Sequence, residues 1–148
     1  MSLYKTIEEN IIKALKAGEK EKLTVLRGLK SELKYKQIEL GKDLSDEDCI
    51  AVFNSALKKR NDSIEQFGNA GRNDLVESEE FGAAVIKTYL PEPLSDDELT
   101  ALIKDAITES GADSPQKIGL IMKIVIPKVK GRADGKRIKN ISIKLLTS

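Results

Sequence analysis

Apolar residues recur every three or four positions along most of the chain, which is the spacing of amphipathic α-helices. In the first 90 residues the pattern predicts four helices: one that carries Leu3 to Leu15 and is closed by Gly18; one over roughly 20–39, followed by Gly41; one that begins at Ser45; and one near 75–90. Asp48, three residues after Ser45, completes a capping box, and a loop is expected over Gly68–Asp74. The predicted inner stripes are Leu3, Ile7, Ile11 and Leu15; Leu23, Leu26, Leu29 and Leu33; Ile50, Phe53, Leu57 and Ile64; and Leu75, Phe81, Ala84, Val85, Thr88 and Tyr89.

The segment Leu90-Pro91-Glu92-Pro93 breaks this pattern, because proline lacks an amide donor and restricts the residue before it. We therefore predict two domains, residues 1–92 and 93–148. Three further helices are expected in the second domain. The first is capped by Ser95 and Glu98 and closed by Gly111, the second starts at Ser114-Pro115 and is kinked or ended by Pro127 near Ile126, and the last is capped by Asp134. Their inner stripes are Leu99, Leu102, Ile103, Ala106 and Ile107; Ile118, Ile121, Met122, Val125 and Val129; and Ile138, Ile141 and Leu145.

The predicted fold is therefore all-α, with a helical N-terminal body of about four helices and a three-helix C-terminal tail. No β-hairpin signal and no internal repeat competes with this interpretation.

Composition excludes several kinds of chemistry. Histidine is absent and Cys49 is the single cysteine, so zinc sites built from thiolates or imidazoles and Ser-His-Asp catalysis lack their groups. We expect no catalytic residues, no metal and no cofactor. The first ten residues lack the apolar run of a secretory signal, and Ile118–Ile126 is far shorter than a membrane span, so we expect a cytoplasmic protein without membrane contact.

Charge is distributed unevenly. Residues 1–113 carry 16 Lys and Arg against 23 Asp and Glu, whereas residues 114–148 carry nine against Asp134 alone. A basic tail thus follows an acidic body, which is typical of proteins with an anionic partner.

The densest basic segment runs from Pro127 to Arg137. It places five cations around two glycines just before a predicted helix N-terminus, where free amides and the helix dipole favour an anion. The candidate nucleic-acid-binding residues are Lys128, Lys130, Gly131, Arg132, Gly135, Lys136 and Arg137. The alternative is a solvated basic turn in which Gly131 supplies left-handed geometry and Asp134 only caps the helix. The spacing is not that of a P-loop.

All six aromatic residues precede residue 94, so the tail has no ring on which an unpaired base would stack. Contacts to the phosphate backbone and to the shape of a folded RNA therefore suit the tail better than reading of single strands.

A second polar cluster covers Lys58–Ser63 and Gly71–Leu75. Arg60 with Asp62, or Arg72 with Asp74, organises a polar site there, or these residues form ordinary ion pairs that tie a loop to a helix. The acidic residues Asp96, Asp97 and Glu98 are explained by capping a helix, and Cys49 by packing in the core.

Four segments together resemble the stand-alone GatB/YqeY-type proteins: Leu23–Arg27, Lys58–Leu75, Tyr89–Glu92 and Gly119–Gly135. The most specific of them, Met122 followed by Pro127–Lys136, is similar to the tail domain of the GatB component of the aspartyl/glutamyl-tRNA amidotransferase. Leu120 stands where relatives usually have a lysine, and Lys123 where a small residue is common.

The resemblance implies a tail that binds tRNA and lies outside any catalytic centre. The leading hypothesis is a non-catalytic protein that binds tRNA or associates with a tRNA enzyme. The alternative is an accessory subunit that binds a protein, either an aminoacyl-tRNA enzyme or an amidotransferase. The third, a carbon–nitrogen ligase with glutamine as amido-N-donor, follows from the family label alone.

Overall fold

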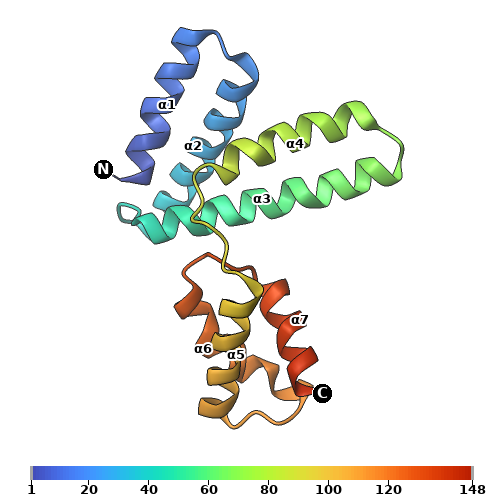
Figure 1. Ribbon diagram of the computed structural model, residues 1–148. Coiled ribbons are helices and arrows are strands. Elements are labelled where there is room, and N and C mark those ends of the chain that lie inside the picture. Colours follow the sequence, from blue (N-terminus) through green and yellow to red (C-terminus); the bar gives the residue numbers. More distant parts are fainter. Residues whose placement is uncertain (1, 148) are drawn as a thin grey trace. The chain divides into compact units, whose positions relative to one another are not determined.

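The computed structural model describes residues 2–147, which form seven α-helices, one short 3₁₀-helix (η1) and no strand (Figure 1). The all-α prediction is confirmed. The chain divides into two compact units, residues 1–90 and 91–148, each with its own apolar core.

The N-terminal unit contains two helical hairpins. The first joins α1 (Leu3–Ala17) to α2 (Lys20–Leu40), and the second joins α3 (Asp46–Asn69) to α4 (Asn73–Lys87) (Figure 1). Their inner faces meet in a core that includes Ile7, Leu26, Leu33, Phe53 and Ile86, each at most 1% exposed.

The ends of α1 and α2 and the start of α3 lie where the sequence predicts them. Gly18 and Gly41 follow α1 and α2 in the left-handed conformation that glycine adopts without strain. At the start of α3, Ser45 Oγ accepts from the Asp48 amide at 3.1 Å and Asp48 Oδ2 accepts from the Ser45 amide at 3.0 Å. Both hydrogen bonds hold the pKa of Asp48 below its usual range. The predicted capping box is confirmed.

Several details of the N-terminal unit differ from the prediction. Of the inner stripe predicted for the fourth helix, Phe81, Ala84 and Thr88 are exposed. Instead α4 buries Ala83 and Ile86 beside Val85, and it ends at Lys87 rather than near residue 90.

Leu15 is 58% exposed, because α1 packs through Ile7 and Ala14, which lie seven residues apart, and Leu15 is rotated away from that line. The loop predicted over residues 68–74 is also shorter, with only residues 70–72 between α3 and α4. Gly71, with φ of 71°, supplies the left-handed conformation in this short turn.

The C-terminal unit is formed by α5 (Asp96–Ser110), η1 (Pro115–Lys117), α6 (Ile118–Val129) and α7 (Gly135–Leu146). Apolar side chains from α5, α6 and α7 fill its centre without exposure: Leu99, Ile103, Ala106, Ile121, Val125 and Ile138.

The start and end of α6 correct the predicted helix. Ser114 makes no side-chain cap, and Pro115 opens a 3₁₀ turn in which the Lys117 amide donates to the Ser114 carbonyl at 3.0 Å. The helix also continues past Pro127 to Val129, so an end near Ile126 is wrong. Proline lies in the last turn of α6, where its missing amide costs one helical hydrogen bond and few further residues depend on it.

Candidate nucleic-acid interface

The predicted basic segment forms the end of α6, the connecting loop and the start of α7. Two consecutive residues in the left-handed region, Lys130 with φ of 48° and Gly131 with φ of 80°, turn the chain as it leaves α6. Asp134 begins α7, because its Oδ1 accepts from the Arg137 amide at 2.7 Å. The loop is therefore fixed at both ends.

The two arginines of the segment contact the chain of their own unit. Arg132 Nε donates to the Glu92 carbonyl at 2.8 Å, and the Arg132 carbonyl accepts from the Leu94 amide at 2.9 Å. Arg137 Nη2 donates to the Leu94 carbonyl at 2.9 Å and to Asp96 Oδ1 at 2.8 Å. These hydrogen bonds hold the segment before α5 against the loop, so both arginines stabilise the fold of the C-terminal unit.

The lysines of the segment face solvent. Lys130 and Lys136 are exposed and form no ion pair with the part of the chain that the structure describes. Lys128 Nζ lies 3.7 Å from Glu109 Oε2, but both side chains are about half exposed or more, so this pair holds the lysine weakly. Three of the seven predicted residues thus present positive charge to solvent.

The glycines have different roles. Gly131 has a positive φ that its position in the turn requires. At Gly135, the first residue of α7, a Cβ would meet Met122 Cε at 3.5 Å, which is ordinary van der Waals contact. Packing therefore does not require a glycine at position 135.

One further exposed cation, Lys139, was not predicted from the sequence. It lies one turn after Lys136 on α7, and both are exposed. The spacing of three residues places them on neighbouring positions of the helix surface, which helical periodicity alone would have indicated. Lys117, in contrast, pairs with Asp113 at 2.9 Å and thereby lowers the pKa of that carboxyl.

The structure places the acidic excess close to the basic segment in the fold. Residues 1–90 are nearly balanced, with 15 basic and 16 acidic residues, whereas residues 91–113 carry seven acidic residues against Lys104 alone. This acidic stretch includes α5, which packs on α6 and α7. The expected acidic body is thus mainly one acidic helix of the C-terminal unit, whose other two helices are basic.

The second polar cluster resolves into ion pairs. Arg72 pairs with Asp74 at 3.4 Å and lowers the pKa of that carboxyl. Arg60 pairs with Glu79 of α4 at 3.2 Å rather than with Asp62, because residues two apart on a helix do not face each other. Cys49 is fully buried, and this burial raises the pKa of its thiol, as expected for a core residue.

Replacing Asp134 with Ala is expected to destabilise the C-terminal unit by about 1 kcal/mol, because the start of α7 loses its cap. Thermal unfolding followed by circular dichroism measures this change. Asp105→Ala is the matched control, since Asp105 is an exposed residue inside α5 and its loss removes the same charge but no cap. Equal destabilisation by the two substitutions would contradict the capping role.

Residues 2–147 contain no candidate membrane-spanning helix and no candidate cluster of metal ligands. No helix in this range is long and apolar enough to cross a bilayer. No group of three or more Cys, Asp or Glu side chains in the same residues is arranged to hold a metal ion.

Comparison with known proteins gives one family and several relatives. The chain matches the family described as Yqey-like protein over residues 4–146. It is 34% identical over 130 residues to altered inheritance of mitochondria protein 41, mitochondrial, of Lachancea thermotolerans, covering 86% of this chain and 68% of the relative. It is 31% identical over 94 residues to a protein of Schizosaccharomyces pombe described as uncharacterized, covering 64% and 76% respectively. The Pyrenophora tritici-repentis protein with the same name as the first is 26% identical over 129 residues, covering 86% and 71%.

Proposed function

Because the chain belongs to the family of Yqey-like proteins, we propose that it is a non-catalytic protein whose C-terminal unit binds the phosphate backbone of folded tRNA. The binding residues are the exposed lysines around the α6–α7 loop: Lys128, Lys130 and Lys136, with Lys139 beside them. Arg132 and Arg137 act as positioning residues, since their side chains hold the segment before α5 against this loop.

The observation that carries the proposal is the conformation of Lys130. A left-handed backbone costs a residue with a Cβ roughly 1–2 kcal/mol, and glycine or asparagine usually stands at such helix ends. Lys130 is exposed and pairs with no acidic group among the described residues. No ion pair of its side chain therefore offsets the strain of its backbone. A charge that binds a ligand accounts for a lysine at this position.

The absence of aromatic residues after position 90 supports contacts to phosphates rather than to bases. Lysine is a compact charge on a flexible stem and recognises phosphate without reading sequence. The acidic helix α5 restricts binding to the other side of the unit, because it repels a polyanion.

Fluorescence anisotropy with bulk deacylated tRNA at about 50 mM salt tests the proposal on the full chain. Saturable binding is expected, and an RNA duplex of the same length should compete poorly, because it lacks the folded shape of tRNA. Absence of binding at this salt concentration would reject the proposal. Equal competition by the duplex would show that the chain binds RNA in general and would reject specific binding to folded tRNA.

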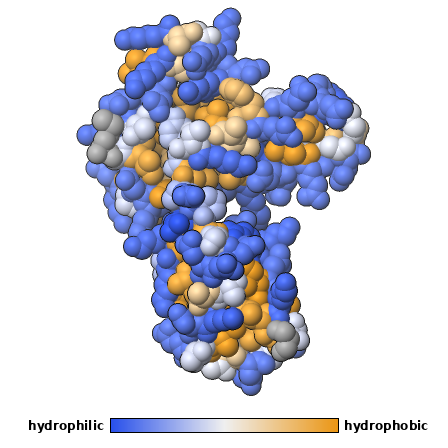
Figure 2. Space-filling view, viewed as in Figure 1, coloured by the Kyte–Doolittle hydropathy of each residue, from blue (hydrophilic) through white to orange (hydrophobic). Residues whose placement is uncertain are grey.

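A second candidate function, an accessory protein-binding subunit, is favoured by apolar residues on the surface of α6. Leu120 is 47% exposed and Ile126 is 51% exposed, and exposed Lys123 lies between them in the helix. Figure 2 shows apolar surface on the C-terminal unit next to hydrophilic side chains. Association with an aminoacyl-tRNA enzyme that survives nuclease treatment would support this function over direct tRNA binding.

No reaction is assigned to the chain, and the ligase activity with glutamine remains a family label. We propose the cytoplasm as its compartment. Two relatives, from Lachancea thermotolerans and Pyrenophora tritici-repentis, are mitochondrial by name, and this location is not transferred to the present chain.

A further inference from the structure

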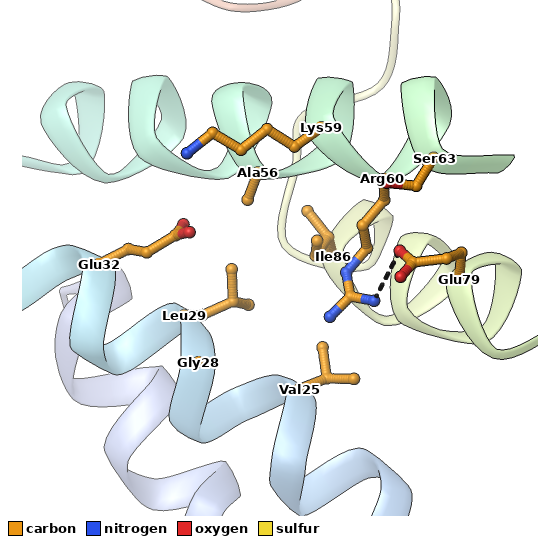
Figure 3. A pocket seen from close by; sticks show the side chains of 10 residues that line it. All are labelled: Val25, Gly28, Leu29, Glu32, Ala56, Lys59, Arg60, Ser63, Glu79 and Ile86. Atoms are coloured by element: carbon orange, nitrogen blue, oxygen red, sulfur yellow. Dashed lines mark hydrogen bonds and ion pairs between the residues drawn. The ribbon is translucent and has the colours of Figure 1, made fainter. Parts of the chain in front are cut away.

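Two adjoining cavities follow the seam between α2 and α3 in the N-terminal unit. One, of about 280 Å³, is lined by α2, α3 and α4 (Figure 3). The other, of about 380 Å³, is lined by α2 and α3. Glu32 and Lys59 line both cavities, so the two adjoin each other, and together they are called here the α2–α3 groove.

The groove has the length of a short helix. Its α2 wall runs from Val25 to Glu39, which is about 21 Å at 1.5 Å per residue. Val25 and Ser63 line the first cavity, whereas Glu39 and Ala51 line the second, so the two walls run antiparallel. A groove of this length between two helices can accept an additional helix.

The floor of the groove is apolar. Its buried side chains are Val25, Leu29, Val52, Ala56 and Ile86, each at most 9% exposed. They offer a row of small and medium aliphatic groups rather than a deep pocket for one large side chain.

Gly28 keeps the α2 wall open. It lies inside α2, where glycine costs about 1 kcal/mol relative to alanine. No atom lies within 4 Å of the place where its Cβ would stand, so packing within the unit does not require a glycine. A partner that approaches the α2 backbone accounts for the missing side chain.

The charges along the groove define what it accepts. Lys36 pairs with Glu39 at 3.5 Å, and Arg60 pairs with Glu79 at 3.2 Å. Glu32 and Lys59, at the middle of the groove, form no ion pair with any residue that the structure describes. Figure 3 shows them on opposite walls, with Glu32 on α2 and Lys59 on α3.

We infer that the α2–α3 groove docks an amphipathic α-helix of a partner protein. The partner helix lays a narrow aliphatic stripe on the floor, with a basic residue toward Glu32 and an acidic residue toward Lys59 at its middle. Oppositely charged residues that flank an apolar seam set orientation and partner choice in helix pairs. This docking site is independent of tRNA binding and lies in the other unit.

A displayed library of helical peptides of about 16 residues, long enough to span the groove, tests the inference on the full chain. The library keeps an aliphatic stripe at i, i+3, i+4 and i+7 and varies the flanking positions. We expect enrichment of peptides with a basic residue on one flank and an acidic residue on the other. Gly28→Leu should lower the affinity of the selected peptides by at least about tenfold, because the leucine side chain fills the groove without disturbing the fold.

Gly68→Leu is the matched control. Gly68 is also inside a helix, is exposed, has open space at its Cβ position and does not line the groove. The double exchange Glu32→Lys with Lys59→Glu should reverse the charges of the selected peptides. Failure to enrich any peptide, equal binding by Gly28→Leu, or unchanged charge preference after the exchange would each overturn the inference. If Gly28→Leu instead turns a dimer into a monomer in sedimentation, the occupant is a second copy of this chain, and a partner helix is excluded.

Discussion

Replacing Lys130 with glycine should stabilise the C-terminal unit and at the same time weaken tRNA binding. Glycine adopts the left-handed conformation of this residue without strain, so we expect a gain of roughly 1 kcal/mol in the free energy of unfolding. Loss of one phosphate contact should lower affinity on the order of tenfold at low salt. Thermal unfolding and anisotropy with deacylated tRNA measure the two effects.

Two further substitutions separate charge from backbone geometry. Lys130→Asn keeps a residue that tolerates the left-handed region but removes the charge, so it should resemble the glycine variant in binding. Lys130→Arg keeps the charge and the strain, so it should retain binding without added stability. A glycine variant that is stabilised and binds tRNA like the original chain would show that Lys130 does not contact RNA.

Replacing Phe53 with alanine should cause the largest loss of stability, about 3–5 kcal/mol. Phe53 is fully buried where α3 meets the rest of the N-terminal core. The centroid of its ring lies 6.0 Å from the centroid of the Tyr89 ring. The substitution leaves a cavity that the surrounding helices fill only in part. Urea unfolding followed by circular dichroism measures the change.

Phe81→Ala is the control for Phe53, because Phe81 is 38% exposed and loses much less buried area. We expect it to cost about 1 kcal/mol or less. Similar losses for both variants would contradict the core that the structure assigns to the N-terminal unit.

Local signals in the sequence predicted the helices and most of their ends. Gly18, Gly41 and Gly111 end helices in the left-handed conformation, and Ser45, Ser95 and Asp134 begin them by accepting from backbone amides. These interactions span at most five residues, so a single sequence contains them. Leu15 shows the limit of periodicity, because the sequence does not reveal which of two adjacent faces of α1 a neighbouring helix covers.

The roles of individual cations depend on residues far away in the chain. Arg132 contacts Glu92, 40 residues earlier, and Arg60 contacts Glu79, 19 residues later. In the sequence, the lysines and arginines of the basic segment look alike. Only the fold distinguishes the lysines that face solvent from the arginines that contact other parts of the chain. The α2–α3 groove was not predicted for the same reason, since each wall comes from a different helix.

The salt dependence of tRNA binding measures how many lysines around the α6–α7 loop contact phosphates. It is compared between the full chain and the double variant Lys130→Gly with Lys136→Gln. If Lys128, Lys130 and Lys136, with or without Lys139, each neutralise one phosphate, the logarithm of the association constant should fall against the logarithm of salt concentration with a slope of roughly −2 to −4. The double variant should bind more weakly, with a slope closer to zero by about 1.5–2. Equal slopes for a folded double variant and the original chain would contradict tRNA binding through the α6–α7 loop.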